Sequence, residues 1–477
     1  MRFGSFHVRL LLIALPLYGL ACNLPLGLIE EATGLSLGSE ETSDSSQSTS
    51  VKGRPSEGGS SEDPNAETNP AGPLPSQDEF IPAEVRAQMD QIQDEVVLLR
   101  GLQPTGPVER GLLSEKELRQ YVLDDFLSDY SQEEARDDAR FLALLGLLDA
   151  DYALFDLYLD LYSENIAGFY DDEIQQLFVV QDSQFGGPER LTYAHEYTHA
   201  LHDQTYDLDE GLGFSHEACE KDSERCAALQ ALLEGDATLL ETRWLLTYAS
   251  DADFQELLDF YDSFSSPTYE SAPEFMKEDF LFPYTAGLDF VEHFFLSGGW
   301  AAVDALYADP PVSTEQILHP GRYPDDVPEP LVVPEVLDSL GSAWREMDRD
   351  VLGEWFTLLT LGELLPDEQA QTAAEGWGGD YYIALHDDSQ ERGLLILTTS
   401  WDTVRDAHEF YGAFRDYGDS RFGERTFSST TRSIWDSTAN WSSIEIAGNQ
   451  TLWILAPDAE IGERLRESLT FPAEVLG

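Results

Sequence analysis

The stretch Leu191-Thr-Tyr-Ala-His-Glu-Tyr-Thr-His199 is the most informative part of this 477-residue chain. It contains the pattern His-Glu-x-x-His, in which His195 and His199 stand four positions apart and Glu196 follows the first histidine. Side chains four apart lie on one face of a helix, so both imidazoles can bind one metal ion while Glu196 faces the open coordination position. The chain has nine histidines. The pattern is therefore expected by chance only on the order of a few hundredths of a time. The alternative is an exposed helix on which two histidines stand four positions apart by chance.

Two histidines do not complete a catalytic zinc site, because such sites usually take three protein ligands and one water. The best candidate for the third ligand is Glu234, in Ala231-Leu-Leu-Glu-Gly-Asp-Ala-Thr238 on the next predicted helix. Gly235 would permit two helices to approach closely. The chain has 91 acidic residues, so a solvated carboxylate is the alternative for Glu234.

This constellation resembles the gluzincin branch of zinc metallopeptidases, and the Glu-Gly-x-Ala stretch is similar to the peptidase MA-like group. The resemblance covers roughly residues 165 to 250. It implies an α+β, zincin-like catalytic domain, with an antiparallel sheet beside the helix of the motif and a glutamate-bearing helix. It also implies Zn²⁺ held by His195, His199 and Glu234. Glu196 would be the general base, taking a proton from zinc-activated water and passing it to the leaving amine.

A peptidase of this class also needs a donor that stabilises the oxyanion of the tetrahedral intermediate. The downstream candidates are Tyr284, His293, His319 and Tyr323. We single out His319 and Tyr323 as predicted catalytic residues, because they lie in a loop-like stretch suited to a cleft. Ordinary hydrogen-bonded structural roles are the alternative. The segments 282–287 and 313–323 also look like parts of uncharacterised exported bacterial proteins of this kind.

Three polar residues beside the motif are candidates for supporting roles. Asp203 lies four residues after His199 and could orient that imidazole. Asp236, two residues after Glu234, should point away from it on a regular helix. His202 could line the cleft, or serve as a satisfied structural histidine.

Hydrophobic periodicity places the motif after two strands. Segments 166–170 and 176–180 predict an antiparallel pair, and the second is a candidate edge on which an extended peptide adds as a further strand. Helices are predicted from Pro188 to about Asp203 and from Cys226 to Ser250.

The whole chain divides into five regions. Residues 1–22 and 23–78 form a leader and a linker, and residues 79–164 are predicted to be helical, with capping boxes at Ser114 and Ser131. Residues 165–350 would form the metallopeptidase domain, with more helices around 287–296 and 301–307. Residues 376–477 predict a small C-terminal α+β domain, with strands at 381–385, 394–399, 427–434, 443–446 and 451–455 and helices at 402–417 and 460–469.

The N-terminal segments indicate export. Residues 1–22 combine basic Arg2 and Arg9 with an apolar run, which is typical of a secretory signal. Tyr18-Gly-Leu-Ala-Cys22 resembles a bacterial lipobox, which implies a lipid anchor at Cys22, although Gly19 departs from the usual pattern; plain secretion is the alternative. Residues 23–78 predict a disordered acidic and serine-rich tether. We therefore expect an exported envelope protein whose membrane contact, if any, is that anchor.

The other two cysteines, Cys219 and Cys226, stand seven positions apart in a polar segment. Two remaining cysteines in an oxidising compartment most simply form an intrachain disulfide. Thiolate ligands to a metal are the alternative, but no further Cys/His spacing completes a four-ligand set.

The net charge of −64 arises from 27 basic and 91 acidic residues. Residues 1–22 hold two arginines and no acid, and residues 23–78 hold ten acids and two cations, so the folded body retains −58. This charge disfavours nucleic-acid and anionic-membrane partners. It suits a protein that works in strong salt, where screening weakens self-repulsion.

Together these features predict an exported zinc metallopeptidase acting on polypeptide substrates. Two alternatives stay open. One is a non-catalytic envelope binding or structural lipoprotein that retains a zincin scaffold. The other is a zinc hydrolase acting on a non-peptide bond, because activated water does not itself select an amide.

Overall fold

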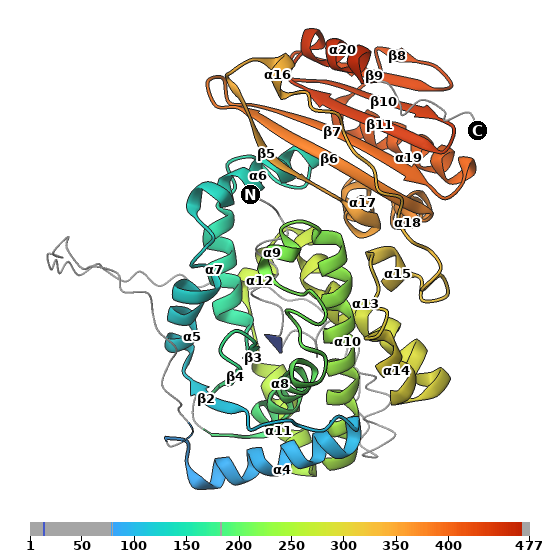
Figure 1. Cartoon of the computed structure of the whole chain (residues 1–477). Coiled ribbons are helices and arrows are strands. Elements are labelled where there is room, and N and C mark those ends of the chain that lie inside the picture. Colours follow the sequence, from blue (N-terminus) through green and yellow to red (C-terminus); the bar gives the residue numbers. More distant parts are fainter. Residues whose placement is uncertain (1–12, 15–77, 79, 182–183, 470–477) are drawn as a thin grey trace, which may run out of the picture.

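The computed structural model describes residues 13–14, 78, 80–181 and 184–469. Nearly all of the predicted signal segment and linker therefore lie outside the described residues. Within the described part, helices and a small four-stranded sheet make up the lower half of the molecule in Figure 1, and a large antiparallel sheet with its helices makes up the upper half. No helix of this part is both long and apolar enough to cross a membrane.

The region predicted to be helical, 79–164, is mostly so. Ser114 and Ser131 each accept a hydrogen bond from the backbone N–H three residues on, and each closes the predicted capping box. One strand, β2 (Glu109–Leu113), interrupts the region. The helices are α4 (Ala83–Arg100), α5 (Glu115–Tyr121), a π-helical turn η1 (Val122–Phe126), α6 (Gln132–Leu145) and α7 (Leu154–Asn165).

The predicted strand pair is present as β3 (Gly168–Asp171) and β4 (Gln176–Val180), which run antiparallel with Phe169 opposite Phe178. The sheet order is β1-β3-β4-β2, in which β2 pairs parallel with β4 and β1 (Ile13–Ala14) pairs antiparallel with β3. The sheet is therefore mixed, not antiparallel as expected. The prediction of β4 as an edge was also wrong, because β2, with only five residues and no alternating pattern, fills that side.

Three long helices follow in layers: α8 (Gly187–Tyr206) packs against this sheet, α10 (Ser223–Tyr248) packs against α8, and α13 (Glu274–Gly298) packs against α10. A Cβ added to Gly235 on α10 would lie 2.1 Å from the carbonyl oxygen of Gly287 on α13. The predicted close approach at Gly235 is therefore confirmed, and it requires glycine on both helices.

The predicted disulfide joins Cys219, the last residue of α9 (His216–Cys219), to Cys226 in the first turn of α10. Both predicted helices near residue 300 are present, although α13 starts earlier than expected. The other helices of this half are α11 (Asp251–Ser263), α12 (Pro267–Ser271), α14 (Trp300–Leu306) and α15 (Thr314–Leu318). The short helix α16 (Leu337–Leu340) lies beside the large sheet in the upper half of Figure 1.

The C-terminal half is a seven-stranded antiparallel sheet of order β5-β6-β7-β11-β10-β9-β8. The strands and helices predicted for this half are present, except that the single strand predicted at 427–434 is two short strands, Phe427–Ser428 and Arg432–Asp436, which pair antiparallel. Its strands are β5 (Trp344–Asp350), β6 (Trp377–Asp387), β7 (Arg392–Trp401), β8 (Phe427–Ser428), β9 (Arg432–Asp436), β10 (Trp441–Ala447) and β11 (Gln450–Ala456). Its helices are α17 (Gly353–Gly362), α18 (Asp367–Ala374), α19 (Val404–Phe422) and α20 (Ala459–Ser468).

The C-terminal unit begins earlier than the predicted boundaries at residues 350 and 376. Strand β5 is hydrogen-bonded to β6, so residues 344–350 belong to this sheet and not to the preceding domain. The sequence of β5, Trp344-Arg-Glu-Met-Asp-Arg-Asp350, is too polar to predict a strand. The two halves also share a core, in which Phe141 of α6 stacks on Tyr382 of β6 with ring centroids 4.6 Å apart.

Candidate metal centre

The metal motif lies in the middle of α8, where every residue from Leu191 to His202 is buried. The helix starts after Gly186, whose backbone N–H donates to Glu189 at 2.8 Å, with Pro188 in the first turn. Strands β3 and β4, and helices α4, α10 and α11, pack around it. The full burial explains why its hydrophobic pattern is weak, since no face is left for solvent.

The three predicted ligands converge. The Nε2 atoms of His195 and His199 are 3.1 Å apart, and Glu234 Oε2 lies 3.1 Å from the first and 3.4 Å from the second. Three donor atoms bound to one tetrahedral zinc at 2.0–2.1 Å would be separated by about 3.4 Å. The residues therefore fit a zinc ion, and the remaining tetrahedral position would be left for water or substrate.

Two of the three buried side chains, His199 and Glu234, are held in the charge state that binds a metal. All three side chains are within 1% of complete burial. Burial, followed by the neighbouring imidazoles, lowers the pKa of His199 to about 4 against the pull of Glu234, which keeps this imidazole neutral. Burial alone would raise the pKa of Glu234, but the two histidines outweigh this effect and lower the pKa. Burial alone would lower the pKa of His195, but its contacts with Glu234 and Glu241 outweigh burial and raise this pKa well above its usual value. A neutral imidazole and an ionised carboxylate are the forms that bind a metal, so a metal ion has to displace a proton from His195.

Sequence reasoning missed Glu241. Its Oε2 atom lies 2.8 Å from Nδ1 of His195, on the side of the ring away from the ligand atom. A carboxylate in this place fixes the tautomer and orientation of a zinc-bound imidazole. Glu241 stands seven residues after Glu234 on α10, which is two helical turns and the same face. That spacing was the available signal.

Glu196 lies under strand β3. It is fully buried, and a Cβ added to Gly168 of β3 would lie 3.3 Å from Glu196 Cγ and 2.6 Å from Thr192 Cγ2. Glycine at position 168 therefore lets the strand pass directly over the predicted general base.

Tyr284, one of the four donor candidates, lies at this centre. It is on α13, buried, with its ring centroid 6.4 Å from that of His195. Burial, then the carboxylates of Glu234 and Glu196, raises the pKa of Tyr284 well above its usual value, so its hydroxyl keeps its proton. The close contact of Gly235 and Gly287 brings α13, and with it Tyr284, against α10, the helix that carries Glu234.

His319 and Tyr323, the predicted catalytic pair, have their contacts elsewhere. His319 Nε2 lies 2.9 Å from Glu354 Oε1 on α17. The Tyr323 hydroxyl donates to the carbonyl oxygen of Asp309, and its ring packs on two phenylalanines of α13. Among the described residues, no hydrogen bond or ring contact joins either side chain to the metal centre.

Asp203 does not orient His199 as expected. Its carboxylate accepts a hydrogen bond from Tyr170 of β3 at 2.8 Å. Asp236 points away from Glu234 as predicted. Its carboxylate accepts hydrogen bonds from the buried guanidinium of Arg100 at 2.8 and 2.9 Å. His202 Nε2 lies 3.0 Å from the same carboxylate, so the structural alternative holds for His202.

Residues 340–466 match a protein family described as a domain of unknown function (DUF8575). The match covers the C-terminal sheet and its helices, and it does not include the metal centre. No curated protein and no solved structure matches the chain.

Proposed function

We propose that the chain is an exported zinc-dependent metallopeptidase. The observation that carries the proposal is the triangle of His195, His199 and Glu234, whose edges of 3.1 to 3.4 Å are those of a tetrahedral zinc site. Glu196 adds the second element, because a metal bound only for stability has no need of an acid between its ligands.

Each side chain around the centre has a chemical task in the proposed reaction. Bound zinc supplies a Lewis acid and a water of near-neutral pKa. Glu196 takes the proton of the attacking water and returns it to the leaving amine. Tyr284 donates a hydrogen bond to the oxygen on which negative charge develops. Glu241 accepts the Nδ1 proton of His195, so that Nε2 presents its lone pair to the metal.

The position of strand β3 favours a polypeptide as the substrate. It passes directly over Glu196, and its outer edge pairs antiparallel with Ile13–Ala14, with Ile13 opposite Phe169. This edge therefore accepts an extended backbone beside the proposed general base. Main-chain pairing of this kind favours a peptide over a small ester or sugar.

The expected location follows from the leader and linker sequences and from the disulfide between Cys219 and Cys226. In this proposal Cys22 carries a lipid, and residues 23–78 tether the enzyme to the envelope. Release of the protein in soluble form by a Cys22→Ser change would support the anchor; unchanged membrane association would contradict it.

Glu196→Gln provides the test of catalysis. Purified wild-type protein in concentrated salt should contain about one zinc per chain and cleave casein or a peptide library. The variant should keep its zinc and lose hydrolysis by about 10²-fold or more. A wild-type protein that holds no zinc, or a variant as active as the wild type, would reject the proposal.

A further inference from the structure

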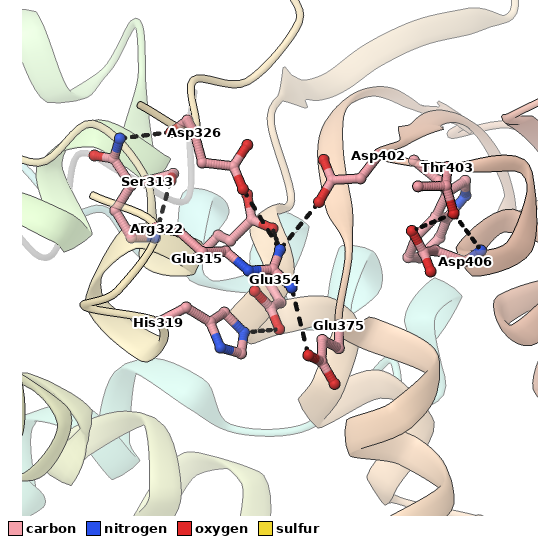
Figure 2. Close-up of polar contacts among 12 residues, drawn as sticks. Ser313, Glu315, His319, Arg322, Asp326, Glu354, Glu375, Asp402, Thr403 and Asp406 are labelled. Atoms are coloured by element: carbon pink, nitrogen blue, oxygen red, sulfur yellow. Dashed lines mark hydrogen bonds and ion pairs between the residues drawn. The ribbon is translucent and has the colours of Figure 1, made fainter. Parts of the chain in front are cut away.

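A second group of acidic side chains lies at the junction of the two halves. Glu315 is on α15, Asp326 follows in the next loop, and Asp402 stands at the end of β7, just before α19. One oxygen or more from each comes within 4.8 Å of the others. Figure 2 shows the three carboxylates turned toward one another around the guanidinium of Arg322.

Acidic side chains outnumber basic ones in this group. Arg322 Nη1 lies 2.6 Å from Glu315 Oε1, 3.0 Å from Asp402 Oδ2 and 3.5 Å from Asp326 Oδ2. Two further carboxylates adjoin it, at Glu354 and Glu375. Five acids therefore face one guanidinium and the imidazole of His319, which leaves uncompensated negative charge.

Two buried oxygen atoms point to a missing ligand. The side chain of Glu315 is completely buried and that of Glu354 is 4% exposed, yet Glu315 Oε2 and Glu354 Oε2 have no hydrogen-bond partner among the described residues. A buried carboxylate oxygen without a partner is costly.

We propose that this cluster binds a calcium ion between Glu315, Asp326 and Asp402. Calcium takes six to eight oxygen ligands at 2.3–2.6 Å, so two oxygens on opposite sides of the ion are about 5 Å apart. Three carboxylate oxygens that all lie within 4.8 Å of one another can therefore bind one calcium ion. Arg322 Nη1 occupies the same space, so calcium displaces it. Glu375, 3.4 Å from Arg322 Nη2 and more than half exposed, retains the displaced guanidinium.

A site of this kind would join the loop after α15 to the start of α19, and thus fasten the C-terminal half to the metal-binding half. It is independent of the zinc centre, because it shares no residue with it. The proposed ligands are carboxylates alone, which suits a hard cation and not zinc.

The competition with Arg322 provides the test. Full-length, zinc-loaded protein in resin-treated, calcium-free buffer of fixed salt is titrated with CaCl₂, and calcium binding is followed by equilibrium dialysis and by the midpoint of thermal unfolding. The wild type should bind one calcium per chain with a Kd of roughly 10⁻⁴ to 10⁻³ M. Its unfolding midpoint should rise by at least about 2 °C.

Two variants should respond in opposite directions. Arg322→Met should unfold at a lower temperature without calcium, bind calcium at least about tenfold more tightly, and recover its stability when calcium is added. Asp402→Asn should bind at least about tenfold more weakly. Glu409→Gln, which breaks an ion pair on α19 outside the cluster, is the matched control and should behave as the wild type.

Failure of calcium to bind both the wild type and Arg322→Met would overturn the proposal and leave Arg322 as the permanent counter-ion. Unchanged binding by Asp402→Asn would also overturn it. If Arg322→Met does not fold, the comparison of wild type with Asp402→Asn by dialysis decides. Neither calcium binding nor thermal unfolding depends on peptidase activity, so these experiments test the calcium site independently of the proposed function.

Discussion

At the scale of single residues, the spacing of His195, Glu196 and His199 was sufficient to predict the centre, because a helix places side chains four apart on one face. Glu234 is one of 91 acidic residues, so it could be chosen as the third ligand only from the sequence around it. The structure brings its carboxylate within 3.4 Å of the Nε2 atoms of both histidines. The choice between Tyr284 and the pair His319 and Tyr323 could not be made from sequence. It depends on how α13 packs on α10, and no local pattern encodes that packing.

Glu241 carries the first residue-scale prediction. Glu241→Gln should lower zinc affinity by about 10- to 100-fold, because His195 loses the carboxylate that accepts its Nδ1 proton. Competition with a chromophoric chelator measures this affinity. Glu217→Gln, which removes an exposed acid paired with Lys221, is the control and should bind zinc as the wild type does. Equal affinity for wild type and Glu241→Gln would contradict the role.

Tyr284→Phe tests the proposed hydrogen-bond donor. The variant should keep full zinc content and near-native KM, while kcat falls by about 10²- to 10³-fold, since the donor acts mainly on charge that develops during the reaction. Tyr323→Phe is the matched control, and it should retain kcat because its hydroxyl binds the Asp309 carbonyl. A large loss in Tyr323→Phe with none in Tyr284→Phe would restore the sequence-based assignment.

At the scale of elements, most helices followed from periodicity and capping boxes, and most strands from alternation. Strands β2 and β5 did not, since neither has an alternating apolar pattern and each is held by its partner strand. Tertiary pairing overrides weak local preference in such segments. The same reason explains why β4 was wrongly predicted to be the edge strand that pairs with a peptide. Its position inside the sheet depends on pairing with β2, which the sequence did not predict.

The crossing of α10 and α13 gives the element-scale prediction. Gly235→Ala should destabilise the protein by about 1–3 kcal/mol and reduce zinc occupancy, because the added methyl would lie 2.1 Å from the Gly287 carbonyl and push the helices apart. Gly412→Ala on α19, where a Cβ meets no atom within 4 Å, is the control. It should be neutral or slightly stabilising, since alanine favours the helix. Thermal unfolding and zinc analysis distinguish the two.

At the scale of the whole molecule, the acidity extends from the surface into the junction of the halves. Asp138 of α6 and Asp380 of β6 are buried there, and burial raises the pKa of each to about 7. Asp138 accepts a hydrogen bond from Tyr130 at 2.7 Å, and Asp380 from Trp377 at 2.7 Å. These contacts can be kept by the protonated acid, so the folded protein retains protons that the unfolded chain releases.

The sign of the resulting pH dependence follows from linkage. A carboxyl group whose pKa rises from 3.8 to about 7 on folding contributes stability that is complete below pH 3.8 and is lost as the pH rises toward 7. Asp138→Asn removes this titration. The stability of the variant relative to the wild type should therefore increase between pH 4 and pH 8, as followed by thermal unfolding at constant high salt. Comparison with the wild type cancels the effect of pH on zinc binding.

The neighbouring residue should behave in the opposite way. Burial alone would raise the pKa of Asp137, but its hydrogen bonds to Arg345 and Arg140 outweigh this and lower it. Its stabilising contribution is therefore present above the ordinary pKa of 3.8 and is lost as the pH falls. Asp137→Asn should be less stable than the wild type at pH 7, and the difference should shrink toward pH 3. Parallel pH profiles for the two variants would show that net charge, and not the partners of each acid, controls the stability of this junction.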